Sequence, residues 1–352
     1  MNAFDSDALL DISGIPEQAE LSSLQMPEKP AGTNLFLSQS SIKQYAGCPY
    51  SYFSNHALNV RETKNSDPDA SDDGILMHTV FERFLRASID ENGSMCLPQP
   101  EDTERIADEI IDEYLHAVYP VEPESMDPAL LHQLYRLRQL TVLMLYNIVE
   151  EIRTSCFVPS AFEQKIGGRR ENSLPEVRLE LENGSTVSLG GTVDRVDFYR
   201  APDGKVYFRV IDYKSGEHTF NPDDVKTGLD IQLVLYLFAT AKANPDAIPA
   251  GANFIALGKT ASKSPEINRT GFFLDDKDLL QAADQTGGYT TKLKKQSREE
   301  IDDLISQMKT IVCEIGLKIM SGYAAKTPSA DACKYCPIAH HCDCAIRTKT
   351  YR

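Results

Sequence analysis

Apolar residues recur at helical spacing in several stretches of this chain, and these stretches give the helices that the sequence predicts. The longest has the sequence L-L-H-Q-L-Y-R-L-R-Q-L-T-V-L-M-L-Y-N-I-V-E-E-I and is amphipathic along its whole length. The predicted helices cover residues 38–45, 75–87, 101–118, 127–154, 230–243 and 298–322.

The pattern changes after Pro159, where β-branched and aromatic residues alternate with polar ones between Asn-Gly and Asp-Gly pairs. Alternation with a period of two is typical of half-exposed strands, and Asn-Gly and Asp-Gly favour tight hairpin turns. We therefore expect an antiparallel meander up to residue 214, followed by a helix and a further strand over 252–258. Helices, then a small mixed sheet, then helices indicate an α/β or α+β fold.

The same pattern divides the chain into a leader and one large domain. Residues 1–34 are acidic, contain proline and lack periodicity, so we expect a disordered leader. The remaining 35–345 should form the domain. Its expected parts are a helical region over about 75–158, a catalytic sheet over about 160–275, and a C-terminal helix with a cysteine hook over 296–345.

Composition and charge restrict the class of protein. No run of about 18 apolar residues exists in the 352-residue chain, and the acidic N-terminus lacks the basic flank of a signal peptide, so we expect a cytoplasmic protein without a membrane segment. The net charge of −16 argues against nucleic-acid binding, but the charge is uneven. Local basic groups occur at 169–170 and 292–295, although a solvated face explains each singly.

Two strand-like segments carry acidic residues and a lysine. G-T-V-D-R-V-D contains Asp194 and Asp197, and I-D-Y-K-S-G contains Asp212 and Lys214. Residues two apart on a strand share a face, so Asp212 and Lys214 should project together. Asp194 and Asp197 are three apart and should point to opposite faces, so at most one of them joins Asp212.

These residue types are the parts of a metal-dependent phosphodiesterase. Carboxylates suit Mg²⁺ or Mn²⁺, which polarise the phosphate and activate a water, and a lysine can position that water. Asp194, Asp212 and Lys214 supply these parts, and Glu163 could add a further ligand. The alternative is a pair of surface ion pairs on an edge strand, but the two segments together favour catalysis.

Two helical pairs are candidates for the same site. His78 and Glu82 are four residues apart and share a helix face, so His78 could bind the metal and Glu82 could orient it. Gln232 and Tyr236 share a face of an otherwise apolar helix. A buried glutamine needs a partner, which is either a core hydrogen bond or the substrate.

Cysteines bracket the chain. Cys48 lies near the start, and Cys333, Cys336 and Cys342 form a C-x2-C-x5-C hook near the end. In a reducing compartment clustered thiols are more often metal ligands than disulfides, whereas Cys96, Cys156 and Cys313 are isolated. We expect a structural group that ties the two ends together. Zinc also accepts four thiolates, and Cys344 could replace Cys342.

At these motifs the chain resembles the RecB-like branch of the PD-(D/E)XK nuclease superfamily. The resemblance lies in G-T-V-D-R-V-D, D-Y-K-S-G, Q-L-V-L-Y and M-H-T-V-F-E, which occur in the family's order. It implies an α/β fold with a restriction-endonuclease-like α-β-β-β-α-β core, a large helical insertion, and Mg²⁺-dependent cleavage of DNA. It also implies roles for six residues: His78, Asp194 and Asp212 as metal ligands, Lys214 as the catalytic lysine, and Gln232 and Tyr236 on the substrate side. Beside these we expect Glu163 to be catalytic and Arg195 to bind the substrate.

The cysteine spacing is similar to the iron–sulfur staple of AddB-type nuclease domains. The resemblance implies a [4Fe–4S] cluster on Cys48, Cys333, Cys336 and Cys342. AddB-type proteins are longer and carry a helicase-like region, whereas no G-x-x-x-x-G-K-[ST] loop occurs here. A helicase subunit is therefore an expected partner, beside DNA.

Three other functions stay open at this point. The chain could be a catalytically silent DNA-binding module or scaffold of a helicase–nuclease complex, although retention of Asp194, Asp212 and Lys214 speaks against this. It could be a redox-sensing iron–sulfur protein. RNA could replace DNA, because two-metal chemistry does not depend on the sugar.

Overall fold

The computed structural model describes residues 28–58, 70–119, 126–258, 266–330, 332–334, 336, 338, 339 and 342. Residues 1–27 of the expected leader (1–34) lie outside these ranges, and so does Cys344. At the other end of the expected leader, the Lys29 N–H donates to the Met320 carbonyl, and the first strand already begins at Asn34. No helix within the described ranges is both long and apolar enough to cross a membrane.

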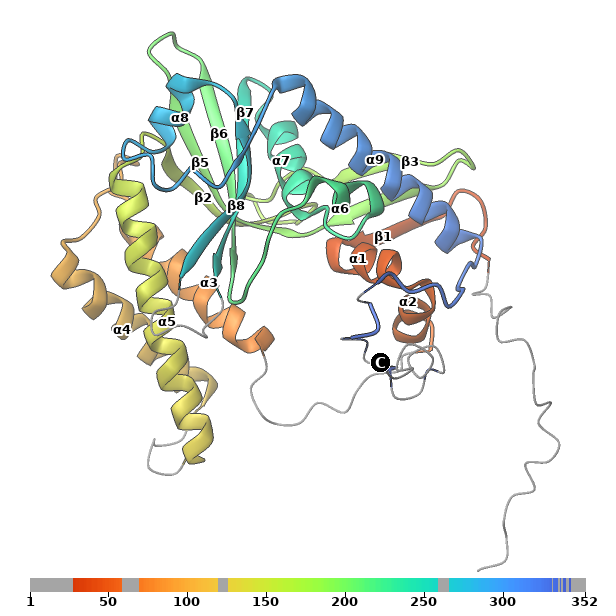
Figure 1. Cartoon of the computed structure of the whole chain (residues 1–352), viewed down its shortest axis with the longest axis horizontal. Helices are drawn as coiled ribbons and strands as arrows, with labels where there is room; N and C mark the ends of the chain where they lie inside the picture. Colours follow the sequence, from red (N-terminus) through yellow and green to blue (C-terminus); the bar gives the residue numbers. More distant parts are fainter. Residues whose placement is uncertain are drawn as a thin grey trace, which may run out of the picture.

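A twisted mixed sheet of six strands forms the centre of the molecule (Figure 1). Its strand order is β2-β5-β6-β7-β8-β9, and β2, β5 and β6 are antiparallel neighbours while β6 and β7 are parallel. The strand bounds are Val158–Lys165 (β2), Thr192–Arg200 (β5), Val206–Lys214 (β6), Ala247–Leu257 (β7), Ile267–Leu274 (β8) and Lys294–Gln296 (β9).

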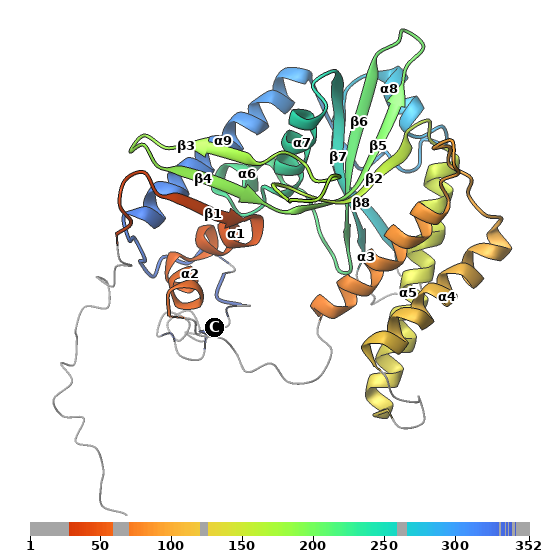
Figure 2. The ribbon, with the colours of Figure 1, turned by 180° about the vertical axis from the view of Figure 1, so that it is seen from behind.

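Helices cover both faces of this sheet (Figures 1 and 2). One face carries α3 (Ala70–Ala87), α4 (Pro100–Val118) and α5 (Pro128–Arg153), whose apolar residues share a core with Ile211, Tyr213 and Ile255. The other face carries α6 (Pro222–Thr227), α7 (Gln232–Ala243) and α9 (Arg298–Met320), which pack with Val196, Val210 and Phe254. A short α8 (Lys277–Ala283) follows β8.

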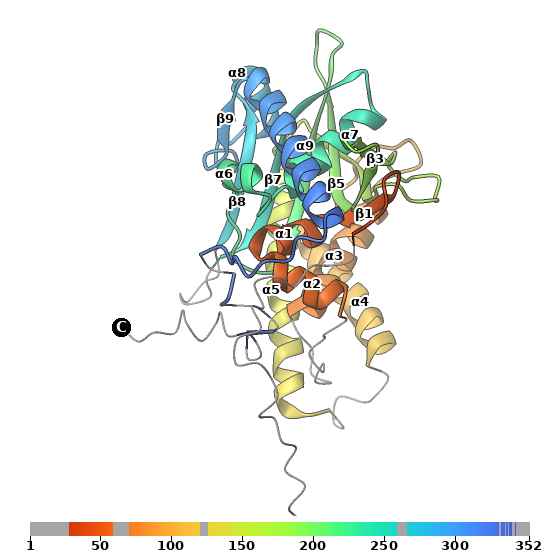
Figure 3. The same ribbon diagram turned by 90° about the vertical axis from the view of Figure 1, so that its right-hand side faces the viewer.

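A second sheet of three strands joins the start of the domain to its middle. It consists of β1 (Asn34–Ser38), β4 (Thr186–Gly190) and β3 (Val177–Glu180), with β1 parallel to β4. Two short helices follow β1, namely α1 (Gln39–Gly47) and α2 (Pro49–His56). Figure 3 shows α1 and α2 beside the C-terminal half of α9, so both ends of the domain meet there.

Capping side chains determine where several helices begin. Ser38 caps α1 by accepting from the Ser41 backbone N–H, and Asp127 caps α5. A reciprocal capping box of Ser297 and Glu300 starts α9. These caps account for the close agreement between the predicted and observed starts of α1, α5 and α9, whereas α3 begins five residues before its predicted start and α2, α6 and α8 were not predicted.

The predicted continuous meander is wrong. The β3–β4 hairpin leaves the main sheet and pairs with β1, and the chain returns to the main sheet at Gly191. A side chain at Gly190 would collide with Phe36 and one at Gly191 with Tyr236. This pair of glycines therefore permits the close packing at the point where the chain changes sheets.

Candidate metal and catalytic site

Strand register places three acidic residues in a row across β2, β5 and β6. Phe162 pairs with Arg195 and Gln164 with Val193, so Glu163 lies opposite Asp194. The β5–β6 ladder ends at the pair Arg195–Ile211, and one further step sets Asp194 opposite Asp212. The row lies where β5 and β6 begin to separate.

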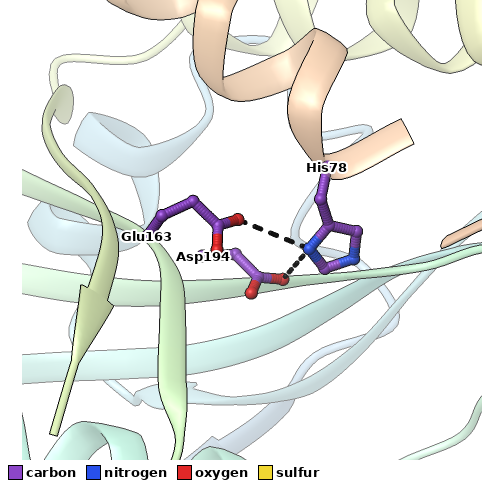
Figure 4. Close-up of side chains that lie close together, drawn as sticks. All are labelled: His78, Glu163 and Asp194. Atoms are coloured by element: carbon purple, nitrogen blue, oxygen red, sulfur yellow. Dashed lines mark ion pairs between the residues drawn. The ribbon is translucent and has the colours of Figure 1, made fainter. Parts of the chain in front are cut away.

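Helix α3 adds His78 to this row (Figure 4). The Nδ1 atom of His78 lies 3.4 Å from Asp194 Oδ2 and 3.5 Å from Glu163 Oε1. Ligand atoms of these three residues all lie within 4.8 Å of one another, which makes the group a candidate metal site. Imidazole nitrogen and carboxylate oxygens suit divalent ions of the first transition row, and carboxylates suit Mg²⁺.

The backbone of Tyr213 contacts two of these residues. Its N–H donates to Asp194 Oδ2 at 2.8 Å, and its carbonyl oxygen lies 3.1 Å from Nε2 of His78. Nε2 can donate to that carbonyl, while Nδ1 faces the carboxylates of Asp194 and Glu163, where a bound ion would take the place of the Nδ1 proton. Metal-binding histidines usually donate their second nitrogen in this way.

Asp212 belongs to a neighbouring network rather than to the His78 group. Its Oδ2 atom lies 2.7 Å from Lys214 Nζ, so these two side chains share a face as predicted. Its Oδ1 atom accepts from Gln232 Nε2 at 2.6 Å, and Gln232 Oε1 accepts from Lys214 at 2.8 Å. Gln232 also contacts the Tyr236 hydroxyl at 3.2 Å. Of the two alternatives for Gln232, the structure shows the hydrogen-bonded one.

The charges in this site are not balanced. Burial and the neighbouring Asp194 raise the pKa of Asp212 to about 7, against the lowering effect of Lys214. Burial raises the pKa of Glu163. Burial alone would lower the pKa of His78, but Asp194, Glu163 and Asp212 together raise it to about 11. The carboxylates thus repel one another and attract any cation, as metal ligands do before the ion is bound.

Glu163 has an unusual backbone conformation. Within the described ranges it is the non-glycine residue with positive φ, at 48°. The register of β2 also shifts between Pro159 and Ala161, just before it. A left-handed non-glycine residue is sparsely populated and often occurs at functional sites. Here it directs the carboxylate towards His78.

Arg195 corrects one expectation. It is completely buried on the opposite face of β5, so it is not available to a substrate. Its guanidinium donates two bonds to Asp197, of 2.8 and 2.9 Å, and one to the Tyr213 hydroxyl at 3.0 Å. The predicted substrate contact of Arg195 is therefore wrong.

Arg195 belongs to a buried charge cluster. Glu151 of α5 lies 3.0 Å from Arg209 and 2.6 Å from Arg269, and Asp197 accepts from Arg209 at 2.9 Å. We call these five residues the sealed cluster: Glu151, Arg195, Asp197, Arg209 and Arg269. They hold α5 to β5, β6 and β8.

Glu82 also differs from expectation. It forms a 2.9 Å ion pair with Arg86 on its own helix, while the second nitrogen of His78 is occupied by Tyr213. The predicted orienting role of Glu82 is therefore wrong, and a backbone carbonyl occupies that position.

Two of the four predicted cluster cysteines line a cavity between the two ends of the domain. Cys48 and Cys336 both line this cavity of about 580 Å³, together with Ser51 and His218. The Ser329 N–H donates to the Gly47 carbonyl at 2.8 Å, which fixes the C-terminal segment beside Cys48. Among the described residues, no three cysteine sulfurs lie within 4.8 Å of one another.

Sequence reasoning missed the sealed cluster and the backbone role of Tyr213. A signal for the cluster existed, because Arg209 and Arg269 interrupt apolar strands and Glu151 lies on an apolar helix. Charges at such positions need buried partners. Nothing in the residue pattern indicates a role for the peptide group of Tyr213.

Comparison with known proteins gives a consistent result. The PD-(D/E)XK nuclease superfamily model matches residues 36–343. A relative from Thermoanaerobacter sp. (strain X514) is 27% identical over 343 residues, which cover 87% of this chain and 29% of its own. Another relative, from Desulforudis audaxviator, is 29% identical over 369 residues, which cover 91% of this chain and 31% of the relative. Both are named as subunits of an ATP-dependent helicase/deoxyribonuclease, and this chain spans about a third of their length.

One solved structure, of a protein from Eubacterium rectale, aligns over 90% of this chain and 89% of its own, at 12% identity and a TM-score of 0.34. The family match is the stronger finding, since it covers nearly all of the domain that contains both the carboxylate row and the lysine. This chain belongs to the PD-(D/E)XK nuclease superfamily.

Proposed function

We propose that this chain is a divalent-metal-dependent nuclease that hydrolyses phosphodiester bonds of DNA in recombination and repair. The observation that carries the proposal is the row of Glu163, Asp194 and Asp212 across three strands, with Lys214 at 2.7 Å from Asp212. The names of the relatives, which combine a helicase with a deoxyribonuclease, support DNA as the substrate.

The site residues fit Mg²⁺ or Mn²⁺. His78, Asp194 and Glu163 present ligand atoms close together, and Asp212 lies next to them. The Oδ2 atom of Asp212 is buried, and its polar contact among the described residues is the ammonium group of Lys214 at 2.7 Å. Its carboxylate could bind an ion on its free lone pairs, and such an ion would polarise the scissile phosphate and activate a water.

The protein residues then have separate roles. Asp194, Asp212 and His78 hold the ion, with Glu163 as a further ligand. Lys214 orients the attacking water and offsets negative charge that develops on the phosphate. Gln232 holds Lys214 and Asp212 in fixed relative positions through hydrogen bonds of 2.8 and 2.6 Å. Tyr236 in turn supports Gln232.

An assay of DNA degradation tests this function. End-labelled single- and double-stranded DNA is incubated with anaerobically purified protein and Mg²⁺ or Mn²⁺, beside the Asp212→Asn variant. Cleavage that needs both the ion and Asp212 is the expected result. A folded protein that binds DNA but never cuts it would favour the silent scaffold, and cleavage of RNA alone would reassign the substrate.

We further propose that Cys48, Cys333, Cys336 and Cys342 hold a [4Fe–4S] cluster that fastens the two ends of the domain. Cys48 and Cys336 line the same cavity, and burial together with the nearby thiols of Cys336 and Cys342 raises the pKa of Cys48. Thiolates are the ligands that iron–sulfur clusters require. Zinc also accepts four thiolates and is the alternative ion for these cysteines.

Metal analysis distinguishes the two. Iron and acid-labile sulfide in equal amounts, with visible absorbance that Cys336→Ser removes, are expected for the cluster. One zinc ion per chain in a colourless protein would instead identify a zinc site and contradict the iron–sulfur proposal. A well-folded, colourless and fully active Cys336→Ser protein would show that no staple is needed.

The relatives are named as parts of a helicase–nuclease, and we therefore propose a helicase as partner. Such a partner would unwind DNA and supply a strand to the site. Co-purification of a motor protein with the tagged chain tests this. Recovery of no motor protein from cells that express the chain at its natural level would count against it.

A further inference from the structure

Tyr213 lies at the point where the two catalytic strands separate. The β5–β6 ladder ends at Arg195–Ile211, whereas β6 continues to pair with β7 through Tyr213 and Lys214. On the β5 side the peptide of Tyr213 contacts the side chains of Asp194 and His78 instead of a strand backbone. The position of this one peptide therefore sets the positions of two proposed metal ligands.

The side chain of Tyr213 points to the other face of the sheet and is buried there. Its hydroxyl accepts from Arg195 at 3.0 Å, and its ring lies edge-on against Phe81 of α3, with centroids 4.9 Å apart. The Arg195–Tyr213 contact thus joins β5 to β6 beyond the end of their backbone ladder. This contact lies on the face of the sheet opposite the carboxylates, at the point where the β5 and β6 backbones separate.

Arg195 is itself buried and held by several partners. Asp197 binds it through two hydrogen bonds, and Glu151 lies 3.7 Å away. Glu151 is held in turn by Arg209 and Arg269. A bidentate arginine–carboxylate pair adds geometric specificity as well as binding energy. The Tyr213 hydroxyl is therefore attached to a fixed point.

We propose that Tyr213 is a positioning residue: its hydroxyl, anchored on Arg195, fixes the peptide that orients Asp194 and His78 for metal binding. The sealed cluster thereby sets the geometry of the metal site from the opposite face of the sheet. This inference rests on the proposed metal-dependent function.

Mn²⁺ binding to chelator-treated protein, measured by calorimetry, tests the proposal without using activity. Tyr213→Phe keeps the ring and removes only the hydroxyl. We expect its Mn²⁺ affinity to fall about tenfold, the lower end of the range for residues that orient metal ligands. Saturating Mn²⁺ should restore most of the cleavage rate, because metal affinity is lost rather than a reacting group.

Two controls separate positioning from general loss of stability. Tyr207→Phe removes a hydroxyl from the same strand, where Tyr207 stacks on Tyr199 away from the site, and should leave Mn²⁺ affinity unchanged. Arg269→Met opens the far end of the sealed cluster without touching Tyr213, and should lower the melting temperature more than Mn²⁺ affinity.

The outcomes separate the positioning role of Tyr213 from the proposed metal-dependent nuclease function. Wild-type affinity in Tyr213→Phe would overturn the positioning role and leave the proposed nuclease function standing. Equal loss of affinity in Tyr213→Phe and Arg269→Met, in proportion to their lost stability, would also overturn it. Failure of the wild-type protein to bind Mn²⁺ would overturn the metal site and this inference together.

Discussion

The two faces of β5 and β6 carry similar charged residues with opposite consequences. On the front, Glu163, Asp194 and Asp212 face Lys214, His78 reaches them from α3 on the other face, and the carboxylates remain in excess. On the back, the sealed cluster sets three arginines against two carboxylates. The back closes on itself without any ligand, whereas the front needs an external cation. One strand therefore combines a structural charge network and a binding site, because alternate residues point to opposite faces.

The carboxyl groups of the two faces show this difference directly. On the front, burial and Asp194 raise the pKa of Asp212 to about 7. On the back, burial would raise the pKa of Glu151, but three arginines lower it to about 2. A raised pKa of a carboxyl group means that the folded protein disfavours its charged form. A lowered pKa means that the charged form stabilises the fold.

The largest expected effect is on the front. Asp212→Asn should reduce metal-dependent cleavage at least about a thousandfold, because it removes a metal ligand. It should also keep or raise the melting temperature of the metal-free protein, since it removes a buried charge that Asp194 repels. Cleavage rates and thermal unfolding of the same preparation measure both.

Asp197→Asn is the matched control for this prediction. It makes the same chemical change on the back of β5, where Asp197 pairs with Arg195 and Arg209. It should lower the melting temperature. If both variants behaved alike in stability, the distinction between the two faces would be lost.

The next largest effect is on the back. Glu151→Gln leaves Arg209 and Arg269 without their shared carboxylate. Removal of one partner from a buried ionic network costs about 3–5 kcal/mol, so urea unfolding should show a loss in this range. Glu150→Gln, on the exposed side of the same helix turn, should stay within about 0.5 kcal/mol of the wild type. A loss below about 1 kcal/mol for Glu151→Gln would mean that the cluster is not a stabilising unit.

Lowering the pH should weaken the sealed cluster by protonating Glu151. The pKa of Glu151 is lowered from 4.5 to about 2, so its contribution to stability is complete above about pH 4.5 and is lost as the pH falls towards about 2. The stability difference between wild type and Glu151→Gln, from urea midpoints, should therefore shrink over this interval, by up to about 3 kcal/mol. A difference that is constant from about pH 5 to about pH 3 would show that Glu151 is not held ionised by its arginines.

Local rules were sufficient to predict the front of the sheet. Asp212 and Lys214 are two residues apart on one strand, and Gln232 and Tyr236 are four apart on one helix, so periodicity alone predicts that each pair shares a face. The observed contacts of 2.7 and 3.2 Å confirm both pairs. The α/β fold class and the long helix of the insertion were predicted for the same reason.

The back of the sheet could not be predicted in this way. Glu151 and Arg269 are 118 positions apart, and β1 pairs with β4 across more than 150 positions. Contacts of this kind depend on tertiary packing, and no periodicity encodes them. The wrong role for Arg195 has a different origin, because strand alternation alone places Arg195 on the face opposite Asp194.

The smallest effect concerns the link between the front carboxylate and its lysine. Gln232→Leu keeps most of the volume but removes the amide that bonds both Asp212 and Lys214. We expect the cleavage rate to fall about 10- to 100-fold, as for other residues that orient ligands, because Lys214 loses one of its two contacts. The pair Lys214–Asp212 remains at 2.7 Å, so activity should not vanish.

Thr240→Val is the control on the same helix α7, since its buried hydroxyl has no partner among the described residues, and it should cleave at the wild-type rate. A Gln232→Leu enzyme as fast as the control would show that charge alone places Lys214. A Gln232→Leu enzyme as inactive as Asp212→Asn would instead make the amide part of the metal site, and the front would then contain one connected network of ligands rather than a ligand group with a separate support.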